Sequence, residues 1–255
     1  MKETIVMKFG GASVKTPENF HQIASIIANR KQIEKKPIVV VLSAMANTTD
    51  ELFNLARQVH PNPPHRELDM LVSVGERISI ALLAMALSLK GIDAISLTGS
   101  QSGIITDESH NEAKIIQVKP QRILSALASN QVVIVAGFQG VSRKGEITTL
   151  GRGGSDTSAV AMAVALKSPC VDFYKDVPGL YNMDPKVHLD ARLLASVGYE
   201  EASFLANKGA KVLHPRSVFL AEKNGVQMKL RSFLKPDAIG TLIGNSTLSA
   251  EALWE

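Results

Sequence analysis

Short runs of consecutive apolar residues alternate along the chain with longer segments in which apolar residues recur every three or four positions. The short runs are rich in Val and Ile, as in strands buried on both faces, and predict strands over residues 5–9, 37–43, 92–97, 131–137, 170–175 and 226–231. The longer segments predict helices over residues 18–34, 50–59, 68–89, 120–129, 155–166, 199–208 and 215–224. This alternation is typical of βαβ units, so we expect an α/β fold, a three-layer αβα sandwich around a mainly parallel central sheet.

Two polar stretches interrupt this pattern. Residues 61–64 form a proline-rich connection between helices, and residues 99–112 predict a loop that is able to move over a site. Neither stretch marks a domain boundary, and the chain contains no internal repeat or Gly/Ser linker. We therefore expect a single domain over residues 1–255.

Composition narrows the class of protein. The 255 residues are 45% hydrophobic and carry a net charge of +4 from 28 basic and 24 acidic side chains, which is compatible with a sizeable core. The single cysteine, Cys170, has no partner for an internal disulfide, so we expect a reducing compartment, the cytoplasm. The apolar run at 78–89 is shorter than the ~18 residues of a membrane helix, and the interrupted basic run at 31–36 is typical of a solvated helix end. We expect neither a membrane nor a nucleic-acid partner.

The first candidate site follows the first predicted strand. Gly10 and Gly11 allow the backbone to approach a ligand, its N–H groups can receive an anion, and Lys8 adds a positive charge. The spacing is neither that of a Walker A loop nor that of a dinucleotide fingerprint. Taken alone, a plain turn explains the two glycines equally well.

The second candidate site is the run 148–156, Thr-Thr-Leu-Gly-Arg-Gly-Gly-Ser-Asp, which leads into an apolar helix. Ser155 and Asp156 are explained by capping of that helix, and the glycines by a turn. Capping does not explain Arg152, whose guanidinium stands between glycines and is free for a bidentate contact with a carboxylate or phosphate. Asp156 is placed to orient a lysine or a metal-bound phosphate. We therefore favour a functional role for this run.

Weaker signals lie elsewhere in the chain. Residues 174–186 surround a Pro-Gly turn with polar side chains suited to a nucleotide, although a surface turn is the simpler reading. Residues 209–215 contain a lysine after a helix end and His214, to which we assign a structural turn role and no catalysis. Glu76 lies in an apolar helical stretch, either buried with a partner or paired with Arg77 at the surface.

Several catalytic signatures are missing from the sequence. It has no His-Glu-x-x-His spacing and no Gly-x-Ser-x-Gly elbow, which argues against zinc hydrolases and serine hydrolases. We assign no metal-ligating side chain.

Together the motifs resemble those of the aspartate kinases of the amino acid kinase family, in the same order and over nearly the whole chain. Residues 8–14 are similar to the family's opening Lys-Phe-Gly-Gly-Thr-Ser-Val, and the run 148–156 matches its most distinctive motif without change. The remaining matches are residues 42–45 with Thr49, residues 75–77, residues 176–179 with 184–185, and residues 209–215.

The resemblance implies transfer of the ATP γ-phosphoryl group to the β-carboxylate of L-aspartate, which gives 4-phospho-L-aspartate, the entry to lysine, threonine and methionine synthesis. Mg²⁺ is expected with ATP, held largely by phosphate oxygens and water. Lys8 would neutralise charge on the transferring phosphoryl group and Asp156 would hold Lys8; both are catalytic by this resemblance. The fold would comprise a substrate lobe over about residues 1–165 and a nucleotide lobe over about residues 166–245.

The resemblance also assigns binding residues. Arg152 would clamp a substrate carboxylate and Glu76 would accept the α-ammonium group, so the substrate-binding set is Thr49, Glu76, Arg152 and Ser155. The nucleotide-binding set is Lys8, Phe9, Gly10, Gly11, Lys175, Asp176, Tyr181, Lys186, Lys211 and Val212.

The chain departs from the family pattern in three places and in length. Ala12 replaces the usual hydroxyl residue, Lys175 stands where Thr is common, and Lys186 stands where Arg is common. Most aspartate kinases continue past the segment 240–243 into paired ACT domains, whereas here residues 244–255 remain. We expect no ACT domain and no lysine or threonine feedback site, and a homodimer formed through the N-terminal half, with or without a separate regulatory subunit.

Two other functions remain open. One is a kinase of the same fold that acts on another acidic amino acid, because the fold does not determine the substrate. The other is a non-catalytic subunit that binds nucleotide or aspartate, against which the joint presence of Lys8, Arg152 and Asp156 argues. Acetylglutamate, glutamate 5- and uridylate kinases are disfavoured by Glu76 and the run 148–156, and a nicotinamide-binding protein by the missing glycine fingerprint.

Overall fold

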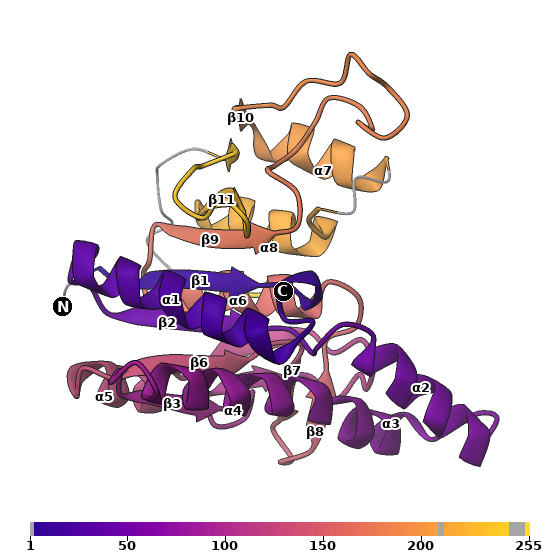
Figure 1. Ribbon diagram of the computed structural model, residues 1–255. Coiled ribbons are helices and arrows are strands. Elements are labelled where there is room, and N and C mark those ends of the chain that lie inside the picture. Colours follow the sequence, from indigo (N-terminus) through magenta and orange to yellow (C-terminus); the bar gives the residue numbers. More distant parts are fainter. Residues whose placement is uncertain (1–2, 209–211, 245–252) are drawn as a thin grey trace.

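The computed structural model describes residues 3–208, 212–244 and 253–255. Its centre is an eight-stranded sheet with the strand order β10-β12-β11-β9-β1-β2-β6-β3 (Figure 1). Neighbouring strands are parallel except β11 and β12. These strands are β1 (Ile5–Phe9), β2 (Ile38–Leu42), β3 (Ala94–Leu97), β6 (Val132–Ala136), β9 (Cys170–Lys175), β10 (Ser196–Val197), β11 (Gln227–Ser232) and β12 (Thr241–Ile243).

Helices cover both faces of the sheet, as the alternation of apolar segments predicted. The helices are α1 (Pro17–Glu34), α2 (Thr48–Val59), α3 (His65–Val72), α4 (Val74–Ser88), α5 (Gln121–Ala128), α6 (Gly154–Ala165), α7 (Tyr199–Asn207) and α8 (Pro215–Asn224), with a 3-10 turn η1 (Gly11–Ser13) after β1. Figure 1 shows α1 and α4 side by side on one face, where they pack on Met7, Val40 and Ile134. Helices α5, α6 and α8 pack on the other face, on Val6 and Val39. The αβα sandwich is therefore confirmed.

Local signals explain where two of the helices start and stop. Helix α1 has Pro17 in its first turn, and the Asn19 side chain accepts a hydrogen bond from Thr16 N at 3.2 Å. Helix α8 begins after His214, whose Nδ1 accepts from Arg216 N at 3.3 Å, and ends at Gly225 with φ +67°. The structural role predicted for His214 is thus a helix N-cap.

The predicted helix over residues 68–89 is wrong in one respect, because the structure has two helices that meet at Ser73. The Ser73 carbonyl accepts a hydrogen bond from Gln139 Nε2 at 2.8 Å, and its hydroxyl donates to Met70 O. Both contacts draw backbone groups away from the regular helical pattern. The break depends on Gln139, a residue distant in sequence, so the local apolar pattern did not reveal it.

A second, smaller sheet was not predicted. Its order is β5-β4-β7-β8, built from β4 (Ile104–Thr106), β5 (Ile115–Val118), β7 (Gln139–Ser142) and β8 (Ile147–Thr149). The segment 99–112, expected to be a mobile loop, contains β4, which pairs with both β5 and β7. These strands have three or four residues each, too few for a period to be visible in the sequence.

Helices α3 and α4 together form one segment, His65–Ser88, that is long and apolar enough to cross a membrane by length and composition. The expectation that no segment reaches that length is corrected to this extent. Half of the apolar window is buried inside the fold, and the segment His65–Ser88 contains two buried carboxyl residues, Asp69 and Glu76. A helix that packs on the core of a protein passes the same test.

Candidate active site

The candidate site lies where the parallel strands of the large sheet reach their carboxyl ends. Lys8 is the penultimate residue of β1, Lys175 is the last of β9, and Asp156 belongs to the first turn of α6. Strands β1 and β9 are parallel neighbours with Lys8 opposite Phe173. The two lysines therefore come together at one edge of the sheet, as ligand sites of open α/β sheets do.

Asp156 forms ion pairs with both lysines. Its Oδ1 lies 2.5 Å from Lys8 Nζ, while Lys175 Nζ lies 3.2 Å from Oδ1 and 3.1 Å from Oδ2. The exposed fractions of the side chains are 5% for Lys8, 8% for Asp156 and 13% for Lys175. Charges this far from solvent are weakly screened, so their interactions are strong. We refer to these three residues as the lysine–aspartate cluster.

The electrostatics of the cluster leave a surplus of positive charge. Burial alone would raise the pKa of Asp156, but the ammonium groups of Lys175 and Lys8 outweigh it and lower that pKa to about 2. Burial and the nearby Lys8 lower the pKa of Lys175 to about 8, in spite of Asp156. At neutral pH the ion pairs of the cluster join two ammonium groups to one carboxylate. Such a site attracts an anion.

Glu76 presents a buried carboxyl group near the cluster. It lies in the first turn of α4, is 3% exposed, and accepts a hydrogen bond from Ala44 N at 3.1 Å through Oε1. Burial raises its pKa to about 8, although backbone amides and the charge of Lys8 lower it in part. Within the described residues, the buried Oε2 has no hydrogen-bond partner. The structure thus decides for a buried Glu76 over a surface pair with Arg77.

Gly75 is what allows α4 to begin so close to the end of β2. A Cβ atom on Gly75 would lie 2.8 Å from the Ala44 Cβ, closer than two such carbons approach in proteins. The contact brings the first turn of α4 onto the segment after β2, and Ala44 N then reaches Glu76. Gly75 thus allows the close approach of the backbone that buries the carboxyl group of Glu76.

Arg152 lies in a short loop, residues 150–153, between β8 and α6. Gly151 and Gly153 have φ +72° and +71°, so both adopt the left-handed conformation that glycine tolerates best. A Cβ on Gly153 would overlap the His214 side chain. Arg152 itself is exposed. We refer to this segment as the arginine loop.

The other two residues of the predicted substrate set begin helices at the same region. Ser155 is half-buried in the first turn of α6, and a Cβ on Gly137, just after β6, would lie 2.9 Å from the Ser155 Cβ. Thr49 is half-buried in the first turn of α2. Helix N-termini present free amides, which favour anionic ligands.

Phe9, Gly10 and Gly11 lead from β1 into η1. The Phe9 side chain has no exposed surface and its ring stacks on Tyr174 with centroids 4.4 Å apart, so only its backbone faces the sheet edge. A Cβ on Gly10 would lie 3.4 Å from Lys8 Nζ. The glycine turn therefore passes close to the Lys8 ammonium group, where backbone amides and ammonium can receive one anion.

The remaining nucleotide-binding candidates lie after β9 or near α8. Asp176 and Lys186 are exposed, Tyr181 is half-buried and bridges to Leu193, and Val212 packs against the core. The structure does not bring Lys186 into the lysine–aspartate cluster. Lys211 lies outside the described residues.

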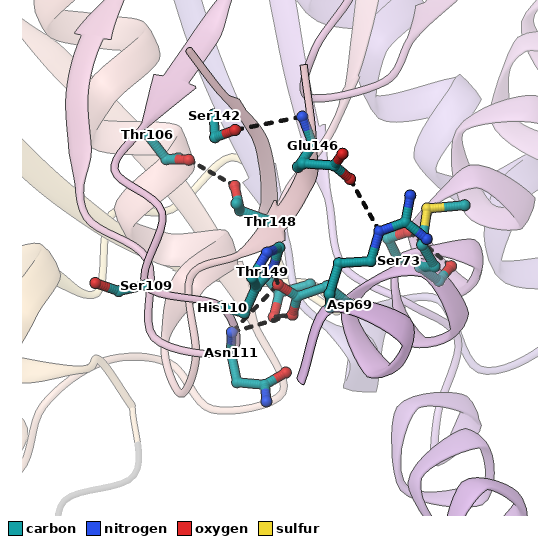
Figure 2. A network of polar contacts seen from close by, with 12 residues as sticks. Asp69, Ser73, Thr106, Ser109, His110, Asn111, Ser142, Glu146, Thr148 and Thr149 are labelled. Carbon is teal, nitrogen blue, oxygen red and sulfur yellow. Dashed lines mark hydrogen bonds and ion pairs between the residues drawn. The ribbon is translucent and has the colours of Figure 1, made fainter. Parts of the chain in front are cut away.

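The sequence analysis missed Asp69, which joins α3 to the segment around His110 and to the end of β8 (Figure 2). Asp69 is fully buried near the end of α3; its Oδ1 accepts from Thr149 Oγ1 at 2.5 Å and its Oδ2 accepts from His110 Nδ1 at 2.6 Å. Asn111 N donates to both oxygens, at 3.1 and 3.2 Å. Asp69 shares α3 with Arg66 and Glu67, so its carboxyl group does not stand out from the local sequence.

The Asp69 contacts determine where the arginine loop starts. Thr149 ends β8 and immediately precedes that loop, and a Cβ on Gly151 would lie 2.8 Å from Asn111 O. The segment around His110 and Asn111 therefore packs directly on the loop, and Asp69 holds both sides. We refer to Asp69, His110, Asn111 and Thr149 as the Asp69 network.

The described part of the chain contains no group of three or more His, Cys, Asp or Glu side chains placed to hold a metal ion. The anion-attracting charge at this edge comes from lysine side chains and backbone amides. A divalent ion at such a site would take its ligands from the phosphates of a nucleotide and from water.

Comparison with known proteins agrees with this geometry. An aspartokinase of Geobacillus stearothermophilus is 49% identical over 239 residues, 94% of this chain and 58% of that protein. An aspartokinase of Mycobacterium tuberculosis is 49% identical over 244 residues, 95% of this chain and 57% of that protein. The chain thus spans somewhat more than half the length of these curated relatives.

Solved structures have the same fold. The aspartate kinase from Synechocystis superposes with a TM-score of 0.87 at 43% identity, over 99% of this chain and 41% of that one. Aspartokinase III of E. coli, solved in complex with aspartate and ADP, gives a TM-score of 0.85 at 29% identity, over 96% of this chain and 65% of that one. The sequence profile of the amino acid kinase family matches residues 3–232, and the chain belongs to the amino acid kinase family.

Proposed function

We propose that this chain transfers the γ-phosphoryl group of ATP to the β-carboxylate of L-aspartate, producing 4-phospho-L-aspartate for the synthesis of lysine, threonine and methionine. The observation that carries the proposal is that a buried carboxyl group without a partner and a positively charged cluster lie near each other at one sheet edge. The buried Oε2 of Glu76 lacks a partner within the described residues and suits an α-ammonium group, while the lysine–aspartate cluster suits phosphate. The aspartokinase names of the relatives and the aspartate and ADP bound in one solved structure support it.

In this proposal Lys8 offsets the charge of the phosphoryl group in transfer, and Asp156 holds Lys8 in place. A carboxylate oxygen of aspartate is already a nucleophile at neutral pH, so the protein needs no general base for the attack. Arg152 would clamp a substrate carboxylate, and Thr49 and Ser155 would complete the pocket. The protein's part is to bring the two anions together and offset their charge.

The nucleotide would lie on the side of the cluster opposite the aspartate. The backbone of Phe9, Gly10 and Gly11 would receive its phosphates. The rest of ATP would be held by residues at and after the end of β9 and before α8, namely Lys175, Asp176, Tyr181, Lys186, Lys211 and Val212. This division makes about residues 1–165 the substrate lobe and about residues 166–245 the nucleotide lobe. Mg²⁺ bound to the phosphates would supply further charge neutralisation.

We also propose that the protein acts in the cytoplasm as a homodimer. Val74, Ile78, Met85 and Leu89 are exposed along α4 and its C-cap, which supports a contact of this face with a second copy. The single thiol, Cys170, supports a reducing compartment.

The proposal is tested by ADP release from Mg·ATP with L-aspartate, L-glutamate, N-acetyl-L-glutamate or UMP as acceptor. Hydroxylamine in the assay traps an acyl phosphate as a hydroxamate. We expect a hydroxamate with aspartate alone, and its loss in Lys8→Ala. Turnover of glutamate in place of aspartate would identify a kinase for another acidic amino acid. Tight nucleotide binding without turnover of any acceptor would overturn the catalytic proposal in favour of a binding subunit.

A further inference from the structure

Lys175 occupies the position where Thr is common among aspartate kinases, and the structure puts it on Asp156 together with Lys8. We propose that Lys175 is a second catalytic cation of this chain, whose ammonium group contacts the oxygens of the phosphoryl group in transfer beside Lys8. This inference rests on the proposed function and deepens it. A threonine at this position would supply a hydroxyl group but no charge.

The charge balance of the cluster supports this role. Lys8 alone neutralises Asp156, so Lys175 brings a positive charge in excess of what the pair requires. Glu76 also acts on Lys8, but its raised pKa of about 8 keeps it mostly protonated at neutral pH. A buried surplus charge is costly in an apo protein and becomes favourable when an anion arrives. The free protein therefore carries the cost of burying the Lys175 charge at the place where a phosphate is expected to bind.

The position of Lys175 supports the same role. Lys175 ends β9 next to β1, and its ammonium and that of Lys8 contact the same carboxylate. The glycine turn passes close to Lys8, and the Ser13 hydroxyl of η1 donates to Tyr174 O, so η1 is tied to the residue before Lys175. Both ammonium groups thus lie beside the turn whose amides would receive the phosphates.

The reaction needs charge but no proton from Lys175. An oxygen of the aspartate β-carboxylate forms a bond to the γ-phosphorus, and the bond between that phosphorus and the β,γ-bridging oxygen breaks. ADP leaves with the bonding electron pair. Negative charge lies on the equatorial oxygens and grows on the bridging oxygen. Two ammonium groups beside these oxygens stabilise the transition state more than one does.

A charged Lys175 makes catalysis depend on pH in a defined direction. The groups that face it are Lys8 from β1 and Asp156 from α6; Glu76 from α4 acts on Lys8, and His214 at the start of α8 acts on Asp156. In the free protein Lys175 loses its proton as pH rises through about 8. Because kcat/KM reports the free protein, kcat/KM for Mg·ATP should decline above that pH. Bound phosphate raises the pKa of Lys175, so the decline of kcat should come at higher pH.

The test compares Lys175→Met, Lys175→Arg and a control, Lys90→Met. Methionine keeps the length of the side chain without its charge, and arginine keeps a charge that does not titrate in this range. Lys90 is exposed and follows the C-terminus of α4, whereas Glu76 lies at the N-terminus of that helix. We expect Lys175→Met to lower kcat roughly 10- to 100-fold, with KM for aspartate changed less than about twofold, and to lose the alkaline decline. Lys175→Arg should retain more activity and stay active to higher pH, and Lys90→Met should match the parent protein.

A binding measurement separates this inference from the proposed function. Calorimetry without acceptor gives the ratio of affinities for Mg·ATP and Mg·ADP, which Lys175→Met should reduce by about tenfold because ATP adds the γ-phosphate. This ratio can be measured even if no acceptor turns over, in which case only the proposed reaction fails. The inference would be overturned if a folded Lys175→Met protein had the kcat, the affinity ratio and the alkaline decline of the parent protein. Lys175 would then only hold Asp156 in place.

Discussion

Two buried aspartates lie at the two ends of the segment 149–156: Asp69 contacts its first residue, Thr149, and Asp156 is its last residue. The protein stabilises their charges by different means. Asp156 is held by two ammonium groups, and the ion pairs leave a net positive charge. Asp69 is held by a hydroxyl, a backbone amide and an imidazole N–H. Both carboxyl groups are less than 10% exposed. The same problem, a carboxylate without water, thus has two solutions in one molecule.

The difference separates chemistry from positioning. Flexible lysine side chains around Asp156 can turn toward a phosphate and keep their charge, so this end of the segment can act on a ligand. The donors around Asp69 come from the end of β8 and from the segment after β4, and one of them is a backbone amide, so this end fixes the course of the chain. Arg152 lies between them in the chain, so the proposed clamping of a substrate carboxylate requires both kinds of contact to be intact.

The largest effect is expected from Asp156→Asn, which removes the charge but keeps the shape. Two buried ammonium groups would then face each other without a carboxylate, so we expect kcat to fall roughly 1000-fold and the free energy of unfolding to fall by about 3–5 kcal/mol. Steady-state kinetics and urea unfolding at pH 7 measure both.

The stability effect of Asp156→Asn should depend on pH with a known sign. The pKa of Asp156 is lowered from 3.8 to about 2, so its contribution is complete above pH 4 and is lost as pH falls toward 2. The difference between parent and variant should shrink over this range. Retention of more than a tenth of the activity by a stable Asp156→Asn protein would contradict the proposed role of the cluster.

A smaller but more selective effect is expected from Glu76→Gln. Glu76 is a third buried carboxyl group and accepts from Ala44 N, while its other oxygen is available for an ammonium group. We expect KM for aspartate to rise about 10- to 100-fold, because the amide cannot supply a charged hydrogen bond, while KM for ATP changes less than about twofold. Initial rates with each substrate varied in turn make the comparison.

Glu76→Gln should also stabilise the protein at alkaline pH. The pKa of Glu76 is raised from 4.5 to about 8, so the parent loses stability as pH rises through this interval, whereas glutamine does not ionise. We expect the Tm of the variant to exceed that of the parent at pH 9 by roughly 2–4 °C for each kcal/mol recovered, and to match it near pH 4. Equal Tm values at pH 9 would mean that Glu76 is paired in solution.

The smallest effect is expected from Thr149→Val, which removes one hydrogen bond of Asp69 and keeps the side-chain shape. The loss of this contact should loosen the arginine loop, raise KM for aspartate about three- to tenfold and lower the free energy of unfolding by about 1–3 kcal/mol. Its matched control is Thr148→Val on the same strand, which breaks the 2.6 Å contact between Thr148 and Thr106 hydroxyls instead. An equal rise of KM in both variants would show a general effect of β8 and contradict a specific role of Asp69.

Much of the fold could be predicted because its signals are local. Each strand of the large sheet that was predicted begins and ends within two residues of its expected bounds, and so do α1, α2, α5, α6, α7 and α8. Runs of Val and Ile, Pro17 and Gly225 act through their immediate neighbours, so a short window contains the whole cause. The small sheet was missed because its short strands are stabilised by partners elsewhere in the chain.

For the candidate site, the sequence predicted most of the residues but not the contacts between them. Lys8, Asp156 and Glu76 stood out by residue type and by resemblance. Asp69, which shares α3 with Arg66 and Glu67, did not. Its partners His110 and Thr149 are 41 and 80 residues away along the chain, so no local pattern connects them. Lys175 was expected to bind the nucleotide, and nothing in its neighbourhood indicated the contact with Asp156.

The sequence by itself determined six strands of the large sheet, most of the helices, the glycine turns and the chemical groups available, because these depend on residues close together in the chain. Only the tertiary structure decided which charges meet. Lys8, Asp156 and Lys175 come from β1, α6 and β9. The shifted pKa values of Asp156 and Lys175 follow from burial and from distances of about 3 Å that exist only in the folded protein. Electrostatic free energy depends on separation and on exclusion of water, and the order of residues in the chain specifies neither directly.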